Sequence, residues 1–360
     1  MAIALNTYVF YTNVSAMHAM ASATAASNVN GSAEESTIKK ILLDPVFVTL
    51  MINCQKPVIS SFNLLAFFLS TRRHRQLLKA LNQANGCMRK NFNCHISGIR
   101  LSLRFIIVSC VTLLFPTVLR VSQALISGEQ LGQFWLVDAS FALVPLWALW
   151  MMMPLYYLET INSAVRFWCR QLNRMIYENY RVNSTQRPLK IFYQSFIQVV
   201  QAQEATQHMF GFYLIFSLVW SVFTLALSIY FGTQTSRLMP ADLPDEYRIG
   251  MQFTLAWTAV QILTAFIYII IICLSGIATN EATMNVTLGV QEIYEDIQTE
   301  DDKYQTDCFT NKIGTQFYWG LNIAGAFPLQ RGFMFTLLSV IATYAMLLMQ
   351  LKGDDKDKST

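Results

Sequence analysis

The stretch FPLQRGFMFTLLSVIATYAMLLMQL, residues 327–351, decides the fold, because it is a long apolar segment with a polar face. About 20 apolar residues are enough for a helix to cross a bilayer. Thr343, Leu347 and Gln350 follow i, i+4, i+7 spacing and share one face, with Tyr344 beside them. A hydroxyl or an amide that faces lipid is costly, so we expect this face to meet protein or water. Two interpretations stay open: hydrogen bonds between packed spans, or a helix that lines an aqueous path.

The rest of the chain is also apolar. Of its 360 residues, 54% are hydrophobic and 13% are charged, whereas soluble domains carry about 25% charged residues. The sequence therefore predicts an all-α integral membrane protein with seven spans. The first is diluted by polar residues, and the second is interrupted by Asn53, Gln55, Lys56 and Pro57. The expected spans lie within residues 1–25, 45–69, 101–126, 134–158, 210–231, 253–274 and 327–351.

Basic residues indicate the orientation of the spans, since Lys and Arg collect in cytoplasmic loops. The net charge of the chain is +4, and its basic residues gather in the loops after the second and the fourth spans. The sequence therefore predicts an inverted topology with the amino terminus inside. Residues 1–352 would form a single seven-helix domain, and residues 353–360 a short extracellular tail. The basic residues in these two loops are Arg72, Arg73, Arg75, Lys79, Arg89, Lys90 and Arg100, then Arg166, Arg170, Arg174, Arg181, Arg187 and Lys190.

The end of the last span also carries a family resemblance. Thr343-Tyr344, five residues and then Gln350 resembles the carboxy-terminal signature of insect gustatory receptors, which usually closes with Phe where this chain has Leu351. The order of apolar spans and basic loops is similar as well. The resemblance implies a seven-helix, ligand-gated, non-selective cation channel related to insect odorant receptors. It also implies homotetramers, or hetero-oligomers with related receptors, held mainly by cytosolic helices around a pore lined by the last span.

Cytoplasmic helical extensions are expected at residues 159–206 and 276–326, because each contains apolar residues at helical spacing. Arg166, Arg170 and Arg174 fall on the face opposite the first apolar stripe. We expect these stretches to pack together as a bundle, and the second to run into the fifth span without a break. The stripes are Ile161, Val165, Trp168, Leu172, Met175 and Ile176; Ile191, Phe192, Phe196, Val199 and Val200; and Val286, Val290, Ile293 and Ile297.

If four copies surround an axis, the last span supplies a pore and a gate. Gln350 would form a ring of amides that replaces part of the hydration of a cation without strong preference. Leu347 and Leu351 would form apolar rings that close the path by dewetting. Thr343 and Tyr344 would line the same path.

A ligand pocket is expected among the outer halves of the spans. Arg120 and Asp138 lie at similar depth on neighbouring spans, where they form either a structural ion pair or polar anchors for a ligand. Aromatic walls with a few polar anchors suit sugars and bitter compounds equally. The other expected pocket residues are Thr117, Gln123, Trp135, Trp220, Thr224, Trp257 and Gln261.

The cysteines indicate neither a disulfide framework nor a metal site. None of the 7 falls in a predicted external loop. The spacing of Cys87, Cys94 and His95 matches no familiar zinc pattern, so no metal or cofactor is expected. Asn30 is the one sequon in a clearly external predicted loop, which makes it the expected glycosylation site.

Three other classes compete with the channel. A G-protein-coupled receptor would need the opposite orientation, and the chain lacks Asp-Arg-Tyr after its third span and Asn-Pro-x-x-Tyr in its last. A secondary transporter usually shows inverted repeats, and a membrane enzyme would need a catalytic motif that the 4 scattered histidines do not form. We expect a non-enzymatic gustatory receptor in the plasma membrane of a chemosensory neuron. Its partners would be a small-molecule tastant, monovalent and divalent cations and the lipid bilayer, without nucleic acid.

Overall fold

The computed structural model describes residues 45–94, 96, 139–181, 187–237, 245–294, 297, 299–315, 321–323 and 327–353, with single positions before residue 20 and between residues 106 and 118. Within these residues the chain is helical apart from one short β-hairpin, which confirms the all-α class. Much of the first and third predicted spans lies outside the described residues. The elements are α3 (Pro45–Leu69), α4 (Thr71–Phe92), α7 (Ala139–Arg181), α8 (Leu189–Arg237), α9 (Asp245–Glu292), α10 (Glu300–Thr315), β1 (Asn322–Ile323), β2 (Phe327–Pro328) and α11 (Arg331–Gly353).

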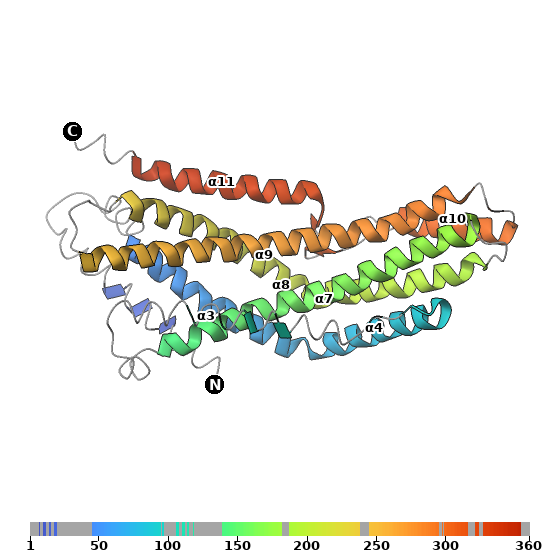
Figure 1. The fold of residues 1–360 in the computed structure, drawn as a ribbon, viewed down its shortest axis with the longest axis horizontal. Helices are drawn as coiled ribbons and strands as arrows, with labels where there is room; N and C mark the ends of the chain where they lie inside the picture. The colour runs from blue at the N-terminus through green and yellow to red at the C-terminus, as the bar shows by residue number, and fades with distance from the viewer. Residues whose placement is uncertain are drawn as a thin grey trace.

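Three long helices form the body of the molecule. α7, α8 and α9 contain 43, 49 and 48 residues, which is about 65–75 Å each at about 1.5 Å per residue. That is about twice the hydrocarbon thickness of a bilayer. Figure 1 shows them running along the long axis, with α3 and α11 beside one half and α4 and α10 beside the other. The fold therefore has two halves that share the same three helices.

Both α8 and α9 join a span to a helical extension without a break. The expected run from residue 191 into the fifth span is confirmed, since α8 is one helix from Leu189 to Arg237. Residues 276–292, part of a stretch expected to be helical, continue the sixth span without a break, because α9 is one helix from Asp245 to Glu292. No proline interrupts this stretch, and its glycines do not end the helix because both pack against neighbours. By length and composition, Leu189–Thr233 and Thr258–Glu292 are the two described stretches long and apolar enough to cross a bilayer.

The apolar core consists of two clusters, one in each half. The first joins α7, α8, α9 and α11 with Leu77 of α4, and partly buried side chains of α3 pack against it. The second joins α4, α7, α8, α9 and α10 and contains most of the three predicted apolar stripes. The prediction that these stripes pack together is confirmed, while their cytoplasmic location stays a prediction. The prediction that Arg166 lies on the face away from the packed stripe was wrong. Its side chain is largely buried against α9, because polar groups on that helix bind its guanidinium.

Aromatic rings connect the helices of the first half. Tyr157 of α7 lies between His74 of α4 and Phe210 of α8, with ring centroids 5.6 and 5.7 Å away. Next along α8, Tyr213 shares a hydrogen bond of 3.2 Å with Tyr268 of α9. Such pairs add to the stability gained from burial alone. These aromatic contacts join α7, α8 and α9 in the half of the molecule on which α11 packs.

Candidate functional site

The last helix, α11, lies along the outer edge of the first half of the molecule (Figure 1). It packs on α8 and α9, and Ile341 and Ala345 are its buried side chains in the described residues. The face predicted to line a path points away from the bundle: Tyr344 is 57% and Leu347 is 48% exposed, and Thr343 and Gln350 are also exposed. Leu351 belongs to the helix, but its side chain lies outside the described residues.

The two polar groups on this face differ in their need for a partner. The Thr343 hydroxyl donates a hydrogen bond of 2.9 Å to the Ser339 carbonyl one turn earlier. That bond lowers the cost of placing the hydroxyl against lipid. Gln350 carries an amide with two donors and an acceptor. Its side chain therefore still favours contact with water or protein over contact with lipid. The pore role of these residues stays a prediction.

An apolar groove of about 640 Å³ separates α11 from α8. Tyr344 lies at its edge, so the groove adjoins the face that carries Thr343 and Gln350. Movement of α11 relative to α8 would change the shape of this groove. Its lining is almost wholly apolar: Ile215, Leu218, Val219, Val222, Phe223, Ala226, Leu227, Ile323, Phe327, Phe333, Leu337, Val340 and Tyr344.

The hairpin before α11 is hydrogen-bonded to the carboxy-terminal part of α9. Asn280 donates hydrogen bonds to the carbonyls of Leu321 (3.2 Å) and Leu329 (3.0 Å) and accepts one from the Leu321 amide (2.6 Å). These bonds hold both ends of the hairpin, in which β1 and β2 pair antiparallel. At the first residue of α11, Arg331 Nε donates to Glu281 Oε1 at 2.8 Å. Nothing in the sequence marked Asn280 as functional, because its partners are backbone groups far along the chain.

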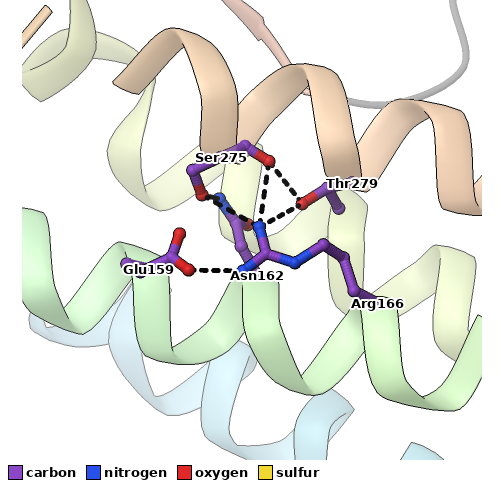
Figure 2. A network of polar contacts seen from close by, with 5 residues as sticks. All are labelled: Glu159, Asn162, Arg166, Ser275 and Thr279. Carbon is purple, nitrogen blue, oxygen red and sulfur yellow. Dashed lines mark hydrogen bonds and ion pairs between the residues drawn. The ribbon is translucent and has the colours of Figure 1, made fainter. Parts of the chain in front are cut away.

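A network of polar side chains joins α7 to the same part of α9 (Figure 2). Arg166 pairs with Glu159 on its own helix and donates to the Ser275 carbonyl at 3.3 Å and the Thr279 hydroxyl at 3.5 Å. Asn162 donates to the Ser275 hydroxyl at 2.7 Å. The Glu159 Oε2 atom is buried and has no hydrogen-bond partner among the described residues. Such a network of ionic and neutral groups is sensitive to small shifts between helices.

We name residues 275–281 of α9 the α9 junction, because they contact α7 on one side and the hairpin before α11 on another. Gly276 lies next to Ser275 in this junction, and a Cβ atom at Gly276 would come within 2.8 Å of the Leu329 Cβ. The close approach therefore requires a residue without a side chain. At this junction α9 makes polar contacts both with α7 and with the start of α11.

A separate polar contact lies in the half of the molecule that contains α4 and α10. Asp302 of α10 accepts a hydrogen bond from the Leu189 amide at the start of α8 (2.9 Å) and from the Tyr180 hydroxyl of α7 (3.2 Å). Burial, reinforced by the nearby Asp302 carboxylate, raises the pKa of Tyr180 well above its usual value. The carboxylate caps the first turn of α8 and ties three helices together away from α11.

The predicted ligand pocket is only partly visible. Thr117, Arg120, Gln123, Trp135 and Asp138 lie outside the described residues, as does Asn30 and the side chain of Trp257.

The three described pocket residues lie on α8 and α9. Trp220 is buried edge-on against Tyr268 at 5.5 Å, and its Nε1 has no hydrogen-bond partner among the described residues. Thr224, one turn along α8, is also buried, whereas Gln261 is half-buried on α9. The grouping of all these residues into one pocket stays a prediction.

Comparison with known proteins gives a fold and one sequence relative. No protein-family model matches the chain. The chain is 34% identical over 319 residues to the "Probable G-protein coupled receptor egl-47" of Caenorhabditis elegans, covering 85% of this chain and 60% of the relative. It thus spans about three fifths of the curated relative's length. The solved structure of the insect olfactory receptor OR5 from Machilis hrabei aligns with a TM-score of 0.57 at 14% identity, over 97% of this chain and 88% of that one. The chain therefore has the fold of this olfactory receptor.

Proposed function

We propose that the chain is a chemoreceptor subunit that forms a ligand-gated, non-selective cation channel of the gustatory receptor type. Four copies, or copies mixed with related receptors, would surround a pore lined by α11. The observation that carries the proposal is the position of α11 in a chain with an olfactory-receptor fold: its Thr343, Tyr344, Leu347 and Gln350 face lies on the outside of the single chain. The setting would be the plasma membrane of a chemosensory neuron, and no catalytic role is proposed.

Gating would pass through the α9 junction. A small tastant, a sugar or a bitter compound, would bind among the outer halves of the spans and shift α7 against α9. Because Asn280 and Glu281 hold the hairpin and the start of α11, such a shift would move α11 and widen the rings at Leu347 and Leu351. The tastant opens the channel only if it binds the open state more tightly than the closed one.

The test is a current measurement on cells that express the full chain. Cells are first screened by calcium imaging against sugars and bitter compounds, and responsive cells are patch-clamped. We expect Gln350→Ala to change cation permeability or pore block while surface expression stays normal, because the amide ring replaces water around the ion. Gln330→Ala, the same substitution just before α11, serves as the control. Identical selectivity, current size and block in the wild type and Gln350→Ala would exclude a pore role for this residue.

A G-protein-coupled receptor is the second candidate, favoured by the name of the nematode relative. The two mechanisms separate in excised outside-out patches perfused with GDP-β-S, which prevents G-protein activation. Tastant-evoked currents that persist support the channel. Responses that vanish in the patch but survive in intact cells support G-protein coupling. A secondary transporter would instead show uptake without unitary channel openings.

A further inference from the structure

A cleft of about 320 Å³ opens where α3 ends and α4 begins, against the middle of α8. The ligand pocket and gate proposed above do not use it. Its walls are apolar along most of their length, and Ser70 and Arg73 lie at one end. The lining residues are Phe62, Leu65, Ala66, Phe67, Leu69, Ser70 and Arg73 from the first two helices, and Met209, Phe212 and Tyr213 from α8.

The apolar walls are open to the surroundings. Leu65 and Phe212 are 46% and 59% exposed, and the neighbouring Phe68 is 78% exposed. α3 ends in the apolar helical stretch Val58–Leu69, so Leu65 and Phe68 belong to a segment suited to lipid contact. A cleft between two such helices, open at the side, has the shape and chemistry to hold an acyl chain.

The polar end of the cleft is strongly basic. Arg72, Arg73 and Arg75 are all exposed in the first turns of α4, and the first turn holds no acidic residue. Arg73 Nη1 donates a hydrogen bond of 3.2 Å to the His208 carbonyl of α8. This bond fixes the guanidinium across the cleft and uses one of the five N–H groups that arginine carries. Guanidinium groups beside an apolar groove complement a phosphate joined to a hydrocarbon chain.

We infer that this cleft binds a phospholipid with an anionic headgroup. The phosphate lies on Arg73, and one acyl chain lies between Phe62, Leu65 and Phe212. The lipid comes from the leaflet that faces the basic end of α4, which is the cytoplasmic leaflet under the predicted orientation. The inference rests on the membrane placement of α3 and α8, and not on gating by a tastant or on the pore.

The experiment is native mass spectrometry of the purified full chain in detergent, titrated with phosphatidylglycerol or with phosphatidylcholine of the same acyl chains. We expect phosphatidylglycerol to bind on the order of tenfold more tightly, because it keeps the net charge that arginine recognises. Arg73→Gln should remove most of this preference. Ala66→Phe, which fills the cleft, and Phe212→Ala, which truncates an exposed wall, should each weaken phosphatidylglycerol binding several-fold.

Lys90→Gln is the matched control, because it removes the same charge at the exposed far end of α4. It should change the dissociation constant less than twofold. An equal loss in Arg73→Gln and Lys90→Gln would mean diffuse surface attraction and overturn the inference. So would equal binding of the two lipids, unchanged binding after both wall substitutions, or displacement by millimolar glycerol phosphate, which carries the headgroup charge without a chain. Each of these measurements is independent of channel current. Failure of the lipid inference can therefore be distinguished from failure of the proposed channel function.

Discussion

Asn280 is a single side chain that holds both ends of the hairpin before α11 through three hydrogen bonds. Replacing it with leucine keeps a similar volume but leaves the Leu321 amide and two carbonyls without these partners. We expect Asn280→Leu to lower the free energy of unfolding by about 1–3 kcal/mol and to weaken tastant-evoked currents. Asn82→Leu, at an exposed position on α4, is the control. Thermal unfolding in detergent checks the first effect, and equal stability of the two variants would contradict it.

Substituting alanine at two different glycines of α9 should have opposite effects on stability. At Gly276 an added Cβ would collide with Leu329 Cδ1 and meet its Cβ at 2.8 Å, so the hairpin backbone would have to move. At Gly289 it would meet only the end of the Asn173 side chain, which can rotate away. We expect Gly276→Ala to cost about 1–3 kcal/mol, and Gly289→Ala to be neutral or stabilising by up to about 1 kcal/mol. Melting temperatures measured side by side check this, and the reverse order would show that the hairpin does not press on α9.

At the scale of the element, the described side chains of α7 form two ion pairs in different settings. The Arg166–Glu159 pair has side chains 14% and 35% exposed and is tied to α9, whereas the Arg174–Glu178 pair is 70% and 42% exposed and lies within one helix. A buried charge that loses its partner costs far more than an exposed one. Arg166 should therefore matter more for how α7 is held against α9.

We expect Arg166→Met to destabilise the protein by about 2–4 kcal/mol, since it leaves Glu159 unpaired and removes bonds to Ser275 and Thr279. Arg174→Met should cost under about 0.5 kcal/mol. Chemical unfolding of both variants measures the difference. Restoring stability with Arg166→Met combined with Glu159→Leu would confirm that the unpaired carboxylate causes the loss, and equal effects of the two single variants would refute it.

For the whole molecule, the arrangement of the two halves bears on orientation. α11 ends at the end of the molecule away from α10, and the basic helix α4 lies in the half with α10 (Figure 1). Since Lys and Arg favour the cytoplasmic side, we expect the half with α4 and α10 to lie inside and the end of α11 outside. The long helices would then extend past the bilayer into the cytoplasm.

We expect an epitope tag at the carboxy terminus to be stained by antibody on intact cells, and an amino-terminal tag only after permeabilisation. The reason is that the Lys and Arg residues of α4 favour the cytoplasmic side, and α11 ends at the opposite end of the molecule. A carboxy-terminal tag that needs permeabilisation would reverse the topology and favour the G-protein-coupled alternative. A co-expressed cytosolic protein, stained only in permeabilised cells, controls for membrane integrity.

The sequence by itself determined the helical class and the three stripes that pack together, because helical periodicity and hydrophobic burial are local signals repeated over many residues. It also indicated which face of α11 to examine. It did not predict that the sixth span continues past residue 276 without a break, nor that Arg166 turns inward. At Arg166 contacts with distant residues outweigh the local pattern.

Only the tertiary structure decided where those helices meet. Asn280, Gly276 and Arg73 look ordinary in the sequence, and their importance comes from partners at Leu329 and His208 that are distant along the chain. Hydrogen bonds to backbone carbonyls leave no residue-type signature on the acceptor side. The junction that holds α11 and the basic cleft beside α3 therefore exist only once the long helices have packed.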